Sequence, residues 1–230
     1  MKLRTSPAFI LSLLLLCFTI LCLGIGRAAL SLATFRSQKG YCVLLDAGHG
    51  GEDPGKVSTS GVKEKDINLA ITLKCKSVLE QNGVRVILTR ETDRSLSEEG
   101  ASNKKASDLQ KRKKLIMDSP IRCAVSIHQN SFPDASSHGS QVFYHPDHSD
   151  SKKLASCIQE RTRNLMGLEN HRTIRPNTDY YLLRDNPVPT VIAEVCFLSN
   201  PSEASLISEE NMQDKAAFLI AMGIMQFLYS

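Results

Sequence analysis

Two patterns of apolar residues recur along the chain and predict strands that alternate with helices. Short continuous apolar runs bounded by turn residues predict buried strands at 41–48, 84–90, 123–130, 140–145, 180–185 and 190–198. Apolar residues at helical spacing predict helices at 64–81, 108–118 (capped by Asp108), 149–165 and from Pro201 onward. This alternation favours a single α/β domain with a twisted, mixed but mostly parallel sheet, which helices flank on both faces.

The N-terminal segment has a different character from the rest of the chain. Lys2 and Arg4 precede an uncharged stretch from Thr5 to Gly26, about long enough to span a bilayer as a helix of ~20 residues. We interpret residues 1–27 as a membrane anchor or export signal. The anchor is favoured because the apolar core of a signal is usually shorter, ~7–15 residues. Residues 28–40 then form a linker, and residues 41–230 form an exported domain.

Composition narrows the class of protein further. A length of 230 residues with 42% hydrophobic residues suits one domain with a full core. The cysteines of the exported domain lie in apolar runs without a CxxC pair, so we expect buried free thiols. The net charge of +4 is concentrated between Lys104 and Lys114. This basic run is either a solvated helix face or an attraction for an anionic polymer. Export and the lack of interleaved aromatic residues argue against nucleic acid.

The stretch LLDAGHGGEDPG, residues 44–55, joins an apolar strand end to one histidine, several glycines and further acids. It matches neither the dinucleotide-binding pattern nor the phosphate-binding loop of nucleotide hydrolases, and its acids would repel phosphate. Ser126 and Ser131 flank His128, but no G-x-S-x-G elbow is present, which argues against a serine nucleophile.

A metal site and a purely structural turn are the interpretations of this stretch that stay open. His49 follows the first strand, Glu64 begins the next helix and His128 lies near the end of a third strand. Carboxyl ends of parallel strands meet at one sheet edge, so these side chains can converge, and catalytic zinc takes three such ligands. Each residue alone also has a structural interpretation. Glu194 is different, because it interrupts an apolar strand where a carboxylate is costly unless it is paired or functional.

Several motifs in order resemble the zinc-dependent N-acetylmuramoyl-L-alanine amidases of the amidase 3 family. They are LLDAGHGGEDPG, GVKEKDINLA, VRVILTRETD, DLQKRKKLI, VSIHQNS, GSQVFYH and IAEVCFLSNPSEA, and the match runs from about Tyr41 to the C-terminus. The motif GVKEKDINLA, the arrangement KKASDLQKRKKLI and the single N-terminal anchor look most like the germination-specific spore-cortex amidases of endospore formers. That group leaves muramic acid free to become muramic-δ-lactam.

The resemblance implies roles for particular residues. His49, Glu64 and His128 would bind one zinc ion, and in a separate role Glu194 would be the catalytic acid and base. Arg112, Asn130 and Arg90 are candidates for substrate contacts, Asn130 also for orienting a ligand, and both arginines equally for structural roles. The chain departs from the family pattern at Ala47, Gln129 and Cys196, none of which replaces a ligand or the catalytic glutamate.

The expected function is zinc-dependent hydrolysis of the amide between N-acetylmuramic acid and L-alanine in peptidoglycan of the spore cortex. Two alternatives stay open: a non-catalytic peptidoglycan-binding protein and a zinc peptidase that cuts within the stem peptide. We expect an exported protein, anchored to the membrane or secreted, at the forespore or spore envelope. An activating partner protein that orders the loop around Glu52 to Gly61 is a further candidate partner.

Overall fold

The computed structural model describes Thr19, residues 40–167 and residues 169–230. Tyr41–Ser230 form one compact unit. The predicted anchor or signal and the predicted linker, residues 1–27 and 28–40, lie outside the described residues except for Thr19 and Gly40. Among the helices that are described, none is both long and apolar enough to cross a membrane.

A six-stranded sheet runs through the unit in the order β2-β1-β3-β6-β4-β5. Its strands are β1 (Cys42–Ala47), β2 (Arg85–Leu88), β3 (Cys123–Asn130), β4 (Gln141–Tyr144), β5 (Arg175–Pro176) and β6 (Thr190–Phe197). β2, β1, β3 and β6 are mutually parallel, whereas β4 pairs with β6 in the antiparallel sense. The predicted mixed, mostly parallel sheet is therefore confirmed.

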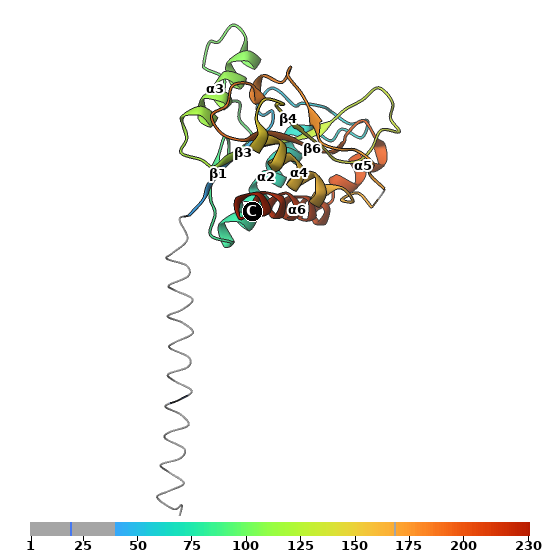
Figure 1. The fold of residues 1–230 in the computed structure, drawn as a ribbon. Coiled ribbons are helices and arrows are strands. Elements are labelled where there is room, and N and C mark those ends of the chain that lie inside the picture. Colours follow the sequence, from blue (N-terminus) through green and yellow to red (C-terminus); the bar gives the residue numbers. More distant parts are fainter. Residues whose placement is uncertain (1–18, 20–39, 168) are drawn as a thin grey trace, which may run out of the picture. The chain divides into compact units, whose positions relative to one another are not determined.

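Helices cover both faces of this sheet (Figure 1). They are α2 (Glu64–Gln81), α3 (Lys104–Asp118), α4 (Ser149–Thr162), α5 (Pro201–Ile207) and α6 (Glu210–Leu228), with a 3-10 turn η1 (Tyr181–Leu183). Val43 and Leu45 of β1 belong to the larger core under α2, α4 and α6, whereas Leu44 belongs to a smaller core under α3 and η1. The alternation follows from the two-residue period of a strand. The five described cysteines are buried and free, as predicted.

The prediction of a strand at 180–185 is wrong. Tyr181–Leu183 form the 3-10 turn, and the short strand β5 lies earlier, at Arg175–Pro176. The apolar character of the run comes from Leu182 and Leu183, which pack onto the sheet as side chains. A segment that packs onto a sheet can be as apolar as a strand within the sheet. Periodicity alone therefore does not distinguish the two.

Helix boundaries differ from the predicted ones at three places. α3 begins at Lys104, and Asn103 caps it by accepting a hydrogen bond from the Ala106 amide, so Asp108 lies inside the helix. α4 ends at Thr162 instead of residue 165. The helical region from Pro201 is two helices, because the chain leaves helical geometry at Glu209, the N-cap of α6.

The order of connections places a crevice at the carboxyl ends of β1 and β3. After β1 the chain runs through α2 to β2, on one side of β1, whereas after β3 it runs to β4, on the other side and beyond β6. The loops after β1 and β3 therefore diverge, which is where open α/β sheets bind ligands. His49 and His128 lie at this point.

Candidate metal centre and active site

Glycines around the turn after β1 leave space for the side chains of the site. His49 itself has a positive φ of 61°, a conformation that costs a residue with a side chain some free energy. A Cβ atom on Gly48 would lie 2.2 Å from the His128 ring, and one on Gly55 would lie 2.5 Å from Oε2 of Glu64. These glycines allow three functional side chains to approach the same backbone.

Two buried arginines hold this turn in place. Arg90 is 1% exposed and Arg112 is 2% exposed. Arg90 donates only to backbone carbonyls, those of Ala47, Gly48, Lys65 and Thr92. Arg112 donates to the carboxylates of Asp46 and Asp108 and to the carbonyls of Ala47 and His49. Every N–H of Arg112 is used in this way. These contacts give both arginines a structural role, and a contact of either one with substrate stays a prediction.

The three predicted ligands converge on one point. Oε1 of Glu64 lies 2.9 Å from Nδ1 of His128 and 3.3 Å from Nε2 of His49. The ligand atoms of the three residues all lie within 4.8 Å of one another, and the two imidazole rings meet edge to face with centroids 4.9 Å apart. Two imidazoles and one carboxylate are a donor set that catalytic zinc uses, so the residues fit a single metal ion.

Neighbouring carboxylates favour a cation at the place where the three predicted ligands meet. Burial opposes charge on Glu64, but hydrogen bonds and charge from His128 and His49 hold its pKa well below the usual value. Burial also disfavours charge on His49, yet Glu64 and Asp53 outweigh it and raise the pKa of His49 to about 9. The site therefore favours positive charge where the two rings face Glu64.

Asp53 orients His49 from the far side of the ring. Its Oδ2 lies 2.8 Å from Nδ1 of His49, and its Oδ1 accepts a hydrogen bond from the Gly55 amide. A carboxylate on one ring nitrogen fixes the tautomer and leaves the other nitrogen free for a metal. Nε2 is the nitrogen of His49 that faces Glu64. Sequence reasoning missed this role, although the spacing of four residues between His49 and Asp53 was visible.

Glu194 lies in β6 directly opposite His128 of β3. The residue is 8% exposed, and Oε2 is the one buried side-chain oxygen or nitrogen of the described residues without a hydrogen-bond partner. Burial raises the pKa of Glu194 to about 7, with Glu64 adding to the effect and the two histidines opposing it. A carboxyl group in this environment can accept and return a proton near neutral pH.

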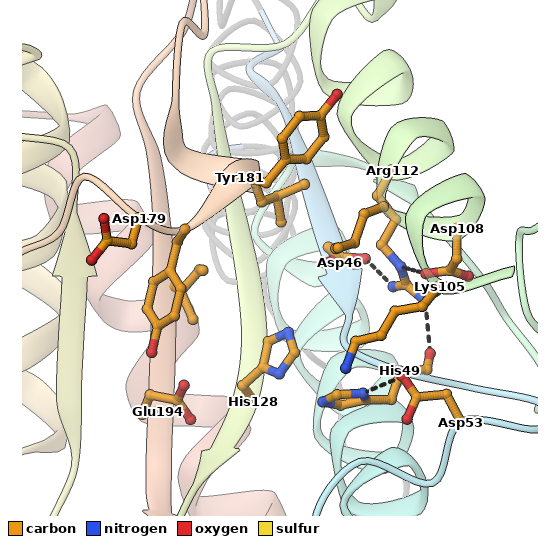
Figure 2. Close-up of a pocket in the computed structure, with 14 residues that line it drawn as sticks. Asp46, His49, Asp53, Lys105, Asp108, Arg112, His128, Asp179, Tyr181 and Glu194 are labelled. Atoms are coloured by element: carbon orange, nitrogen blue, oxygen red, sulfur yellow. Dashed lines mark hydrogen bonds and ion pairs between the residues drawn. The ribbon is translucent and has the colours of Figure 1, made fainter. Parts of the chain in front are cut away.

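A cavity of about 410 Å³, here called the site cavity, opens above these groups (Figure 2). His49 and His128 lie at its base, with Glu194 on the β6 side and Asp53 on the opposite side. Its walls come from α3 and from the segment around η1. Those walls consist of Lys105, Asp108, Leu109, Arg112, Asp179, Tyr180, Tyr181 and Leu182, and Asp46 of β1 and Ile192 of β6 complete the lining.

Asn130 lies at the end of β3, where the register with β6 shifts. Its Oδ1 accepts a hydrogen bond from the Ser131 amide, and the residue does not line the site cavity. Its predicted contact with substrate or ligand stays a prediction. Sequence reasoning also missed Tyr180 and Tyr181, because the run that contains them was interpreted as a strand in the sheet.

Comparisons with known proteins agree with this geometry. A family model described as N-acetylmuramoyl-L-alanine amidase matches residues 43–226. The germination-specific N-acetylmuramoyl-L-alanine amidase of Bacillus subtilis (strain 168) is 38% identical over 192 residues, which are 82% of this chain and 80% of that protein.

Solved structures extend the similarity to the fold. The CwlD amidase of Clostridioides difficile, determined in complex with the GerS lipoprotein, is 43% identical with a TM-score of 0.79; the match covers 83% of this chain and 99% of that chain. The catalytic domain of CwlV from Bacillus (Paenibacillus) polymyxa var. colistinus is 33% identical with a TM-score of 0.72, over 82% of this chain and 98% of that one.

Proposed function

The chain belongs to the N-acetylmuramoyl-L-alanine amidase family, and from this premise we propose that His49, Glu64 and His128 hold one zinc ion. The activity of this family is hydrolysis of the amide that joins N-acetylmuramic acid to L-alanine in peptidoglycan. Membership of the family and the site of two histidines and one glutamate make this chain a metallohydrolase. The observation that carries the proposal is the convergence of two imidazoles and a carboxylate beside Glu194, whose buried oxygen has no partner.

Each group of the site then has a part in the reaction. A bound zinc ion would polarise the scissile carbonyl and lower the pKa of water towards ~7. Glu194 takes the proton of the attacking water at its unpartnered Oε2 and later delivers that proton to the amine nitrogen of the departing L-alanine. Asp53 keeps the proton of the His49 ring on Nδ1. Nε2, which faces Glu64, is then free to bind the metal.

The site cavity also shapes how water and substrate reach these groups. Ile192, Leu182 and Tyr180 make part of its wall apolar, which strengthens the electrostatic interactions of Glu194 inside it. Burial raises the pKa of Glu194 to about 7, which suits a carboxyl group that serves as base and then as acid near neutral pH. None of these steps requires a serine nucleophile or an acyl-enzyme.

We infer that the natural substrate is peptidoglycan of the spore cortex and that cleavage leaves muramic acid free to form the δ-lactam. This inference is supported by the relatives named germination-specific amidase and CwlD amidase. A cell-wall substrate implies a location outside the cytoplasm. The relative from C. difficile was solved in complex with a lipoprotein, and we propose that this chain also binds a lipoprotein partner, which would be its activating partner.

The test uses the full-length chain, stripped of metal by a chelator and mixed with purified cortex peptidoglycan. Added Zn²⁺ should restore release of complete stem peptides with a free L-alanine amine, and added Mg²⁺ should not. Equal release without any metal would contradict the zinc proposal. Shortened stems with the alanine still attached to the glycan would instead indicate a peptidase.

A further inference from the structure

The basic run on α3 contains one cation that the fold does not use. Within the part of the chain that the structure describes, the ammonium group of Lys105 makes no ion pair or hydrogen bond. Its neighbours in the run all have partners at short range. Lys104 pairs with Glu52 at 2.7 Å, Lys111 with Glu98 at 2.6 Å, Lys114 with Asp118 at 2.7 Å, and Arg112 with Asp46 and Asp108. Lys113 donates to the backbone carbonyl of Arg184 and to Oδ1 of Asn186.

Lys105 lies where two cavities meet. It lines the site cavity and also a second cavity of about 460 Å³, here called the outer cavity. Figure 2 shows its side chain extending from α3 toward His49 and Asp53. The other residues of the outer cavity are small or polar: Gly51, Glu52, Asp53, Ser95, Ser97, Lys104 and Asp108. Lys105 therefore lies on the route by which an extended ligand would leave the metal centre.

The carboxylates near Lys105 already have other hydrogen-bond partners. Asp53 bonds to His49 and to the Gly55 amide, and Asp108 bonds to Arg112 and to the Leu96 amide. The charge of Lys105 is therefore available to a ligand.

The opposite wall of the site cavity differs in chemistry. Tyr180, Tyr181 and Asp179 line the cavity there, and Figure 2 shows Asp179 across the site from Lys105. Aromatic faces suit the apolar face of a sugar ring, whereas Asp179 and Glu194 on that side repel a carboxylate. An amphipathic substrate would therefore bind with its glycan toward the tyrosines and its anionic end toward Lys105.

We propose that Lys105 binds a carboxylate of the stem peptide and that the outer cavity receives this peptide. The proposal rests on the amidase function given above, because it takes the peptide as the amine side of the scissile amide. The second residue of such a stem, a γ-linked D-glutamate, bears a free α-carboxylate. An extended chain advances at most about 3.6 Å per residue, so this carboxylate lies within roughly 7 Å of the cleaved bond.

The experiment compares two soluble muropeptides that differ only in whether the second residue carries a carboxylate or a carboxamide. Lys105→Gln should raise KM for the carboxylate substrate about 10-fold, as expected for one charge-assisted hydrogen bond, and should leave kcat unchanged. KM for the carboxamide substrate should stay the same. Lys105→Arg should restore most of the loss for the carboxylate substrate.

Lys114→Gln is the matched control, because it removes the same charge from the same helix outside both cavities. It should leave KM unchanged for both substrates. If Lys105→Gln left KM unchanged, or raised it equally for both substrates, the carboxylate assignment would be overturned.

Calorimetry of the free stem peptide with the full-length chain gives a readout that does not depend on turnover. Wild type should bind the acidic peptide about 10-fold more tightly than Lys105→Gln does, and equal affinities would overturn the proposal. If wild type binds the peptide through Lys105 but cleaves neither muropeptide, the proposed function fails while this inference stands.

Discussion

Gln129 and Cys196 contact each other beneath the metal ligands, with Sγ of Cys196 donating to Oε1 of Gln129 over 3.1 Å. Both residues are places where the chain departs from the family pattern. Nε2 of Gln129 donates to Oδ1 of Asn68 at 3.0 Å, and Nδ2 of Asn68 donates to Oε1 of Glu64 at 3.3 Å. The two departures therefore form one buried hydrogen-bonded chain that ends on a proposed zinc ligand.

Asn68→Ala should weaken zinc binding. The substitution removes a donor to Glu64 and leaves the Gln129 amide without its partner, and loss of such support around a metal ligand typically costs 10–100-fold in affinity. Competition with a chromophoric chelator measures the zinc affinity. An affinity equal to that of wild type would show that the chain does not position Glu64.

Cys196→Ser should keep zinc affinity close to that of wild type, because serine retains a donor to Gln129, whereas Cys196→Ala should lower it. The matched control is Cys75→Ala, which removes another buried thiol from the core on α2. It should reduce the free energy of unfolding without changing zinc affinity. If Cys75→Ala and Cys196→Ala lowered zinc affinity equally, the effect would be one of packing.

Gly55→Ala should abolish tight zinc binding through crowding. The new Cβ would lie 2.5 Å from Oε2 of Glu64 and 2.6 Å from Cδ2 of His49, so a ligand must move. Gly61→Ala is the control, because Gly61 also has a positive φ but has no atom within 4 Å of the added Cβ. Both variants should lose about 1 kcal/mol of unfolding free energy through backbone strain. Equal zinc affinities in calorimetry would contradict the crowding argument.

Asp46→Asn should destabilise the protein in a pH-dependent way. Burial disfavours charge on Asp46, but Arg112 and the hydroxyls of Ser126 and Thr89 lower its pKa to about 2. A lowered pKa in the folded state stabilises the protein above the unfolded pKa of about 4, and this stability is lost as the pH falls through about 2. The contribution is about 2 kcal/mol at neutral pH.

Urea unfolding of the metal-free proteins measures this difference. Wild type should exceed Asp46→Asn by at least about 2 kcal/mol at about pH 6, because the variant also leaves Arg112 short of a partner. The gap should shrink below about pH 4. A gap that stays constant down to about pH 2 would mean that Asp46 does not titrate in this way.

Much of the fold was predictable, because its strands and helices follow simple periodicity. The helix at Glu64–Gln81 and the strand at Cys123–Asn130 have the predicted bounds. The segment at 180–185 was not predictable in this way, since Leu182 and Leu183 are buried from a turn that lies on the sheet. Buried residues form an apolar run in the sequence whether or not their backbone pairs within the sheet.

The candidate site was predictable for the residues whose chemistry conflicts with their position. Glu194 in an apolar strand is such a case, and the structure gives it a buried oxygen without a partner. The supporting residues Asp53, Asn68 and Gln129 carry no such conflict, because polar residues near a turn or on a helix are ordinary. Gln129 contacts Asn68 across 61 positions and Cys196 across 67, so only the fold brings these residues together.

The most direct test of the account is to measure bound zinc and turnover together in wild type, Glu194→Gln and His128→Ala. Glu194→Gln should bind zinc as wild type does and lose about 10²–10⁴-fold in kcat, the usual contribution of a general acid and base. His128→Ala should lose zinc and turnover together. If Glu194→Gln released stem peptides at the wild-type rate, or if wild type bound no zinc, the central claim would be contradicted.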